Sequence, residues 1–216
     1  MMVSQNVVSE DDIILNGILS DKDIPGEPLF RAYVEAKVYD KEGHIIQYHR
    51  QPMKSLTQYF LALMTIPLLA TYQSSSSTQA NPIFTNITGI PSQMSTGIAI
   101  YIYWNASIQV GSGTQSFSPT LNSLAAPIAN GTGGGELQYG TLSVGYTSTS
   151  FFVNVIVTNL SGSTINVTEI GLFGTIAWYN ISTTYTFLLS YDTFSSPISI
   201  PNNALATFQV TITFSG

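Results

Sequence analysis

The sequence predicts a mostly β protein, a two-sheet antiparallel sandwich of jelly-roll type with one apolar α-helix inserted near residues 55–66. Several segments alternate apolar and polar residues at a period of two, which is typical of half-buried strands. Turn residues separate roughly eight such segments, as in β-sandwiches. Few charged residues follow Lys54, so packing and β hydrogen bonding must supply most of the stability. An immunoglobulin-like strand order stays open as an alternative.

Charge is distributed unevenly along the 216 residues. All Lys, Arg and His residues lie at or before Lys54, and only Glu136, Glu169 and Asp192 are charged after it. A surface of Ser, Thr, Asn, Gln and Tyr is nearly independent of pH and suits acidic or harsh surroundings. The alternative is a low-charge structural or adhesin-like β domain of an exported protein. Specific nucleic-acid binding is not expected, because this segment has no cation to neutralise phosphates.

Cofactor and metal sites are not predicted. The chain has no Cys, which excludes disulfides and thiolate–metal sites. His44 and His49 lack a third His or a carboxylate at a metal-site spacing, so we interpret both as exposed strand residues. No cofactor motif is present, because the glycine-rich run at 130–136 is not followed by the Lys-Ser/Thr of a phosphate-binding loop.

Residues 1–28 are predicted to form an arm, and residues 29–216 the sandwich domain. The first segment is acidic, irregular and ends in Ile-Pro-Gly-Glu-Pro, which disfavours helix and central strand. Its apolar residues suggest docking on a neighbouring subunit, and a disordered tail is the alternative. No secretory signal is recognisable, and no apolar run reaches the ~18 residues of a membrane span. We therefore expect synthesis in a host cytoplasm and release inside a particle, or a signal lost by maturation.

Residues 31–39 alternate apolar and polar side chains and predict a half-buried strand. Asp40 to Gly43 predicts a turn with Gly at positive φ, and residues 44–49 return as the second strand of a hairpin.

Residues 55–66 contain the predicted helix. Ser55 and Gln58 have the spacing of a capping box, and Pro67 ends the run. The apolar residues at helical spacing are candidate subunit contacts: Leu56, Tyr59, Phe60, Leu63 and Met64. Such a helix is usually buried against a sheet or a neighbouring subunit, and insertion into a host envelope is the alternative.

Two long loops are predicted, at residues 73–95 and 105–136, on either side of a strand at 97–104. Loops of this length in a compact domain are usually functional or interfacial. Further strands are predicted at 137–146, 184–191 and 204–214.

Residues 151–173 predict a β-hairpin, with Phe151, Val153, Val155 and Val157 on one face and a loop containing Gly162. Glu169, in the second strand, is predicted to be an edge or subunit-contact carboxylate that bonds backbone N–H groups. The alternative is a glycosidase pair with Glu136. Because no cation, imidazole or nucleophile elbow accompanies these carboxylates, we expect no enzyme activity.

Asn-X-Ser/Thr sequons make six positions candidates for N-glycosylation: Asn86, Asn105, Asn130, Asn159, Asn166 and Asn180.

The C-terminal half resembles β-rich virion proteins of phages and archaeal viruses. The resemblance lies in Asn166–Phe173 (NVTEIGLF), Phe187–Phe194 (FLLSYDTF), Pro197-Ile198, Pro201 to Asn203 and the alternating terminal strand. The start, a strand and Gly turn followed by Lys54-Ser55 and an apolar helix, is similar to the start of such proteins. The composition points to viruses of hot acidic springs, of spindle-shaped or turreted type.

The resemblance implies a thermostable structural component of a particle, a homo-oligomeric ring at a tail or vertex, such as a nozzle, adaptor or turret subunit. The implied partners are other virion proteins, namely capsid, adaptor or tail spike. A host-attachment or glycan-binding module, using the loops at 73–95 and 105–136, is the second hypothesis, with host envelope or glycans as partners.

Overall fold

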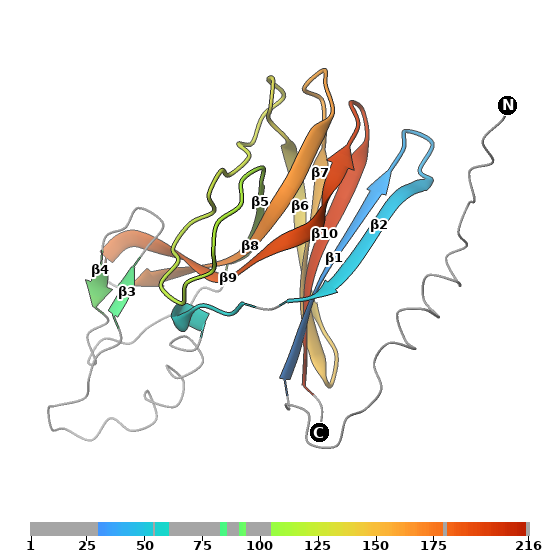
Figure 1. The fold of residues 1–216 in the computed structure, drawn as a ribbon. Coiled ribbons are helices and arrows are strands. Elements are labelled where there is room, and N and C mark those ends of the chain that lie inside the picture. Colours follow the sequence, from blue (N-terminus) through green and yellow to red (C-terminus); the bar gives the residue numbers. More distant parts are fainter. Residues whose placement is uncertain are drawn as a thin grey trace, which may run out of the picture.

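The computed structural model describes residues 30–53, 55–60, 83–85, 91–93, 105–178 and 181–214. The described strands form two antiparallel sheets packed face to face and one separate two-stranded hairpin (Figure 1). Their bounds are β1 (Phe30–Tyr39), β2 (Ile45–Pro52), β3 (Ile83–Thr85), β4 (Pro91–Gln93), β5 (Asn105–Gly111), β6 (Gln138–Tyr146), β7 (Ser150–Thr158), β8 (Ile165–Trp178), β9 (Ile181–Ile200) and β10 (Leu205–Phe214). The predicted mostly β fold with two antiparallel sheets is confirmed.

The larger sheet has five strands in the order β2-β1-β10-β7-β6. At its centre the first and last of these strands pair, with Val34 opposite Val210. The side chains that face the other sheet are the alternating ones predicted for residues 31–39, 151–157 and 206–214. They include Val34, Val153 and Phe208, each 1% exposed or less. Burying one such side chain fully stabilises the fold by about 1.5–3 kcal/mol.

The predicted turn between β1 and β2 is confirmed. Gly43 has a φ of 88°, a conformation that costs a glycine little. Asp40 accepts backbone hydrogen bonds from Glu42 (3.0 Å) and His44 (2.8 Å). These bonds, chiefly that from His44, hold the pKa of the Asp40 carboxyl below its usual range.

The smaller sheet has three strands in the order β5-β8-β9. One face of β8 contributes Ile170 and Leu172 to the main core between the sheets, and the other face contributes Phe173 to a second apolar cluster. Where this second cluster covers the outer face, both faces of the three-stranded sheet are therefore buried.

The predicted hairpin at residues 151–173 is wrong, because β7 and β8 lie in different sheets. The connector crosses from one sheet to the other, and Asn159, fully buried, holds it in place. Its amide nitrogen donates to the carbonyls of Ser163 (2.8 Å) and Ile200 (2.7 Å), and its oxygen accepts from the Ser161 backbone N–H (3.0 Å). Two strands can bury their apolar faces against each other from opposite sheets, or side by side in one sheet. The alternation of apolar and polar residues is the same in both arrangements.

Two glutamines join the edge of the larger sheet to the edge of the smaller one. Gln47 of β2 donates to the Pro197 carbonyl (3.1 Å) and accepts from the Ser199 backbone N–H (2.9 Å). Gln51 donates to the Thr193 carbonyl (2.9 Å) of the same strand, β9. The side-chain amides of Gln47 and Gln51 thus make hydrogen bonds to β9 of the kind that the backbone of a neighbouring strand would make.

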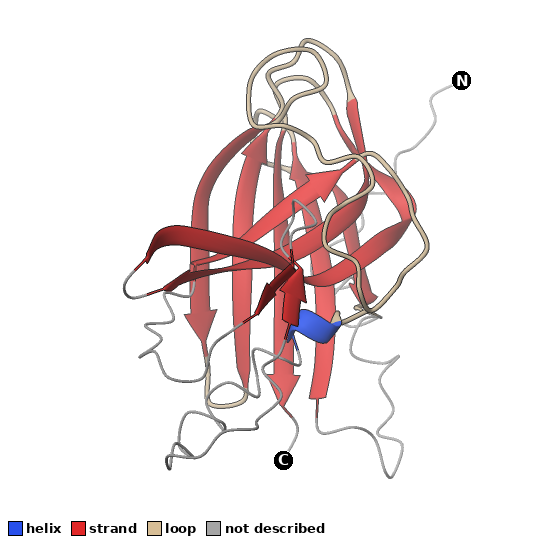
Figure 2. Cartoon of the chain, turned by 90° about the vertical axis from the view of Figure 1, so that its left-hand side faces the viewer, coloured by secondary structure: helices blue, strands red, loops and turns tan. Residues whose placement is uncertain are grey.

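The described part of the predicted helix is one turn, residues 58–60 (Figure 2). The predicted capping box is wrong, because the Gln58 N–H donates to the Pro119 carbonyl (3.0 Å). The Ser55 carbonyl instead accepts from the Tyr191 N–H (3.1 Å), and the Thr57 N–H donates to the Leu189 carbonyl (2.9 Å). Residues 55–57 therefore pair with β9 as a short edge segment, which places Ser55 in strand-like pairing and not at a helix N-terminus.

The predicted loop at 105–136 is wrong over residues 105–111, which form β5. Ala106, Ile108 and Val110 alternate at a period of two and are buried, a short strand signal within a polar stretch. Within the predicted loop 73–95, the structure describes the hairpin of β3 and β4. The arm at 1–28, the strand at 97–104 and the helix beyond residue 60 lie outside the described residues.

The strand order does not establish the predicted jelly roll. Within the two sheets of the sandwich, three described hairpins join neighbours in sequence, β1 with β2, β6 with β7 and β8 with β9. The order β5-β8-β9 corresponds to the C-F-G sheet of an immunoglobulin domain, whereas the other sheet has β10 between β1 and β7.

Candidate functional site

A loop at residues 112–136, here called the covering loop, lies over the outer face of the three-stranded sheet. Figure 2 shows it as a long tan trace across the strands. Its Leu124, with Leu121 packed alongside, contacts a cluster formed by Phe173, Leu188 and Tyr191. The loop therefore has a small apolar core of its own, in addition to the main core of the sandwich.

Glu169 anchors the covering loop. The side chain is fully buried, and its two oxygens accept hydrogen bonds from the backbone N–H groups of Ala125 (3.0 Å) and Ala126 (2.8 Å). Hydrogen bonds to an ionised carboxylate contribute about 1.5–3 kcal/mol. The prediction that Glu169 bonds backbone N–H groups is confirmed. The prediction that it lies at an edge or contacts another subunit is wrong, because β8 is the central strand and the residue has no exposed surface.

Tyr191 forms a second anchor. Its hydroxyl accepts from the Gln115 N–H (3.0 Å) and donates to the Gln115 carbonyl (3.3 Å). Burial, with a smaller contribution from the Glu169 charge, raises the pKa of Tyr191 to about 12. The hydroxyl therefore remains a neutral donor throughout the physiological pH range.

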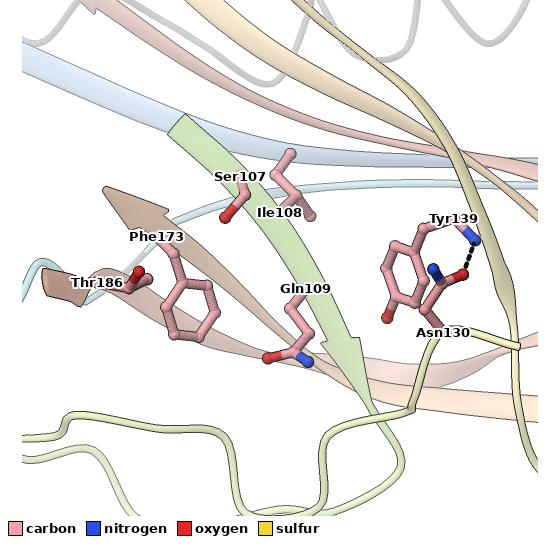
Figure 3. Close-up of a pocket in the computed structure, with 7 residues that line it drawn as sticks. All are labelled: Ser107, Ile108, Gln109, Asn130, Tyr139, Phe173 and Thr186. Atoms are coloured by element: carbon pink, nitrogen blue, oxygen red, sulfur yellow. Dashed lines mark hydrogen bonds between the residues drawn. The ribbon is translucent and has the colours of Figure 1, made fainter. Parts of the chain in front are cut away.

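An open pocket of about 270 Å³ lies beside β5. It is lined by Ser107, Ile108, Gln109, Asn130, Tyr139, Phe173 and Thr186. Figure 3 shows the Gln109 amide between the rings of Phe173 and Tyr139, with Asn130 bonded to the Tyr139 backbone N–H (3.0 Å). The lining has no charged group, so any ligand would be recognised by neutral hydrogen bonds and apolar contact.

Two polar side chains of the pocket, those of Ser107 and Gln109, are available to a ligand. Ser107 is exposed and Gln109 half-buried, and neither side chain makes a hydrogen bond among the described residues. The Tyr139 hydroxyl, in contrast, is engaged with the Val110 N–H (3.2 Å) and the Ile128 carbonyl (3.1 Å). Burial raises the pKa of Tyr139 to about 12. Ser107 and Gln109 are therefore the free recognition groups, and Tyr139 is a structural one.

Three of the five predicted subunit contacts on the helix, Leu56, Tyr59 and Phe60, lie within the described residues. Tyr59 and Phe60 are 1% and 3% exposed and belong to the main core, and Leu56 packs partly buried against it. As subunit contacts, Tyr59 and Phe60 are wrong, because their own chain already covers them. Leu63 and Met64 lie outside the described residues.

The three carboxylates after Lys54 are each held by backbone groups. Glu136 accepts from the Gly133 N–H (2.8 Å), and Asp192, which is 6% exposed, accepts from the Thr193 N–H (2.9 Å). No hydrogen bond joins Glu136 to Glu169. Among the described residues no group of three His, Cys, Asp or Glu side chains is placed to bind a metal ion.

The sequons differ in accessibility. Asn130 and Asn166 are exposed, whereas Asn159 is fully buried and uses its amide to hold the β7–β8 connector. A glycan on Asn159 is incompatible with this structure. Asn105 lies in β5 opposite Thr175, and Asn86 and Asn180 lie outside the described residues.

The sequence does not predict the pocket or the anchoring of the covering loop by Tyr191 and Gln115. Ser107 and Gln109 fall within the predicted loop at 105–136, although the alternation of β5 marks them as outward-facing strand residues. Nothing in the sequence indicates that Gln115 pairs with Tyr191, because they are 76 residues apart.

In the described part of the chain, the helical structure is too short to cross a membrane. No protein-family model matches the chain, and no curated protein or solved structure is significantly similar to it.

Proposed function

We propose that this protein is a structural component of a virus particle that assembles into a homo-oligomeric ring at a tail or vertex, as a nozzle, adaptor or turret subunit. The observation that carries the proposal is the engagement of Glu136, Glu169 and Asp192 with backbone N–H groups of their own chain. General acid–base chemistry needs a titratable group placed beside its reacting partner. These carboxylates serve the fold, which favours a scaffold over a catalyst.

The surface also supports assembly in acidic surroundings. The charges of the described surface are concentrated on the β1–β2 hairpin, where Lys37 contacts Glu35 (3.3 Å) and the Arg50 guanidinium lies over the Tyr33 ring (4.4 Å). The remaining strands present neutral side chains, so their contacts with neighbours would change little with pH or salt. Other virion proteins, namely capsid, adaptor or tail spike, are the proposed partners, and the virion is the proposed location.

Two finer features belong to this proposal. One is classification of the sandwich as a jelly roll, and the other is an apolar helix continuing from residue 60 to about 66. An experimental structure of the assembled protein would test both.

The oligomeric state tests the proposed function. Native mass spectrometry and size-exclusion chromatography with light scattering should give one defined stoichiometry, and negative-stain images should show a closed ring. A strictly monomeric protein at high concentration would overturn the proposal.

The pocket beside β5 favours a second candidate, a host-attachment module that binds neutral glycans. Free amide and hydroxyl groups at Gln109 and Ser107 next to an aromatic ring suit the hydroxyls and apolar faces of a sugar. Screening on a glycan array, followed by NMR titration of the best neutral glycan, tests this candidate. Gln109→Ala should abolish binding, and Gln209→Ala, on β10 of the other sheet, should retain it. Absence of glycan binding by the native chain would remove this candidate.

A further inference from the structure

Among the described residues, the outer edge of β6 has no backbone partner from Gly140 to Tyr146. On its inner side β6 pairs with β7, and residues 137–139 are additionally bonded to residues 129–131 of the covering loop. Beyond them no strand or loop among the described residues pairs with the edge. An open strand edge presents unpaired N–H and C=O groups that another strand can join.

Two of the other three edges of the sandwich, those of β9 and β5, have hydrogen-bond partners for their backbone groups. Gln47 and Gln51 connect β2 to β9, and residues 55–57 pair with β9. The edge of β5 is bonded by residues 126–128, through the Ser112 N–H to the Ala126 carbonyl (2.9 Å) and the Ile128 N–H to the Val110 carbonyl (2.9 Å). Among the described residues, no strand pairs with the outer edge of β2 either, but β2 carries the charged Arg50, whereas the edge of β6 has neither a backbone partner nor a charge.

The residues of β6 do not protect this edge. Proteins commonly guard an edge strand with Lys, Pro or an inward-pointing charge, and β6 (QYGTLSVGY) contains none of these. Val144 is 61% exposed and Tyr146 is 88% exposed. Both lie opposite core-facing positions of β7, Val144 opposite Val153 and Tyr146 opposite Phe151. They belong to the apolar face of the larger sheet, at the side where the narrower sheet does not cover it.

We propose that β6 pairs in antiparallel fashion with β6 of a second copy, around a two-fold axis at Val144. This inference rests on the proposed assembly and identifies one of its interfaces. The register follows from the irregularity between Tyr139 and Leu142, which limits the regular edge to residues 142–146, and Val144 is the centre of that segment. The two five-stranded sheets would then join into one continuous sheet.

A second copy is the occupant that the side chains favour. Around this axis Val144 lies opposite Val144 of the second copy, and Leu142 lies opposite Tyr146 of the second copy. Cross-strand apolar and aromatic pairs of this kind contribute roughly 0.2–1 kcal/mol each. A neutral strand can approach itself without like-charge repulsion, and it offers no charge to select an acidic or basic partner. A cyclic ring would need a second, head-to-tail interface in addition to this isologous one.

Disulfide trapping tests the interface, because the native chain has no cysteine. Directly opposed strand residues have Cβ atoms about 4.5–5.5 Å apart, close to the separation that a disulfide spans. Val144→Cys should therefore convert almost completely to a covalent dimer under mild oxidation. Ile46→Cys is the matched control for random collision, because Ile46 is 51% exposed on β2 and should give little dimer.

Substitution by Lys provides the second measurement. Val144→Lys should dissociate the β6 interface in native mass spectrometry, since two ammonium groups would face each other at the axis. Ile46→Lys should leave the stoichiometry unchanged, and circular dichroism should show both variants folded.

The outcomes separate this inference from the proposed function. An oligomer that persists while Val144→Cys fails to cross-link overturns the β6 interface and leaves the assembly proposal standing. A native chain that is monomeric at every concentration overturns both. A Val144→Cys thiol protected from alkylation in the monomer also overturns the inference, because the chain itself would then cover the strand.

Discussion

Gly111 of β5 lies directly opposite Glu169 of β8, and the Glu169 side chain occupies the space where a Cβ of residue 111 would lie. That Cβ would also come within 2.7 Å of the Ala126 carbonyl oxygen. The absence of a side chain at position 111 is therefore what lets the carboxylate reach the covering loop.

Gly111→Ala should destabilise the protein by about 1–3 kcal/mol, the usual cost of forcing an extra carbon into a packed site. Urea denaturation followed by fluorescence measures the loss. Gly134→Ala is the control, because nothing lies within 4 Å of a Cβ at that position, and it should change stability by less than ~0.5 kcal/mol. Equal effects of the two substitutions would contradict the assigned role of Gly111.

Glu169→Gln should loosen the covering loop while leaving the sandwich folded. The carboxamide keeps one oxygen but loses the charge and the second acceptor, so either Ala125 or Ala126 loses its partner at a cost of about 1–3 kcal/mol. Hydrogen exchange should accelerate at these two amides. Glu136→Gln, at a more exposed residue that bonds the Gly133 N–H, should leave their exchange unchanged. Unaltered exchange in Glu169→Gln would refute the anchoring role.

Asn159→Ala should destabilise the fold by about 3 kcal/mol. It leaves the buried carbonyl of Ile200 without its donor and the Ser161 backbone N–H without its acceptor, and each orphaned group costs about 1–3 kcal/mol. Thermal unfolding measures the effect. Asn166→Ala, at an exposed sequon that accepts one bond from Ser199 (2.8 Å), should change the melting temperature little. A mild effect at Asn159 would show that the connector does not depend on this amide.

Alkaline pH should destabilise the protein as pH rises from about 10 to about 12. The folded-state pKa values of Tyr139 and Tyr191 are raised to about 12, mainly by burial, whereas unfolded tyrosine titrates near ~10. The folded state therefore binds these protons more tightly than the unfolded state. The stability that this difference contributes is fully present below pH ~10 and is lost as pH rises through the folded-state pKa values. Tyrosinate absorbance and the free energy of unfolding should show this window. Tyr139→Phe should weaken the dependence, and an identical profile in that variant would contradict the assignment.

Local patterns predicted the strands and their faces, but not which strands are neighbours. The alternation of residues 31–39 and 206–214 identified the buried sides of β1 and β10, yet it carried no information that these two strands pair. The same limit explains the incorrect hairpin at 151–173, because an inward apolar face is equally satisfied by a strand in the opposite sheet.

The candidate site was predictable in part. An isolated glutamate in an apolar strand must be hydrogen-bonded if it is buried, and backbone N–H groups were the expected donors for Glu169. The identity of these N–H groups depends on how residues 112–136 fold back on the sheet. The position of this loop depends in turn on the long-range packing of Leu124 against Phe173 and Leu188. Tyr59 and Phe60 show the same limit, since an apolar helical face does not specify whether its own chain or a neighbour covers it.

The pairing of β1 with β10 limits when the larger sheet can fold during synthesis. Residues 30–39 leave the ribosome well before their partner strand, residues 205–214. The middle of the larger sheet therefore cannot close until residues 205–214 have been made. Contacts of such large sequence separation fold slowly, and until β10 arrives the apolar faces of β1 and β7 remain exposed to other chains in the same cell. Expression at lowered temperature should therefore increase the soluble yield.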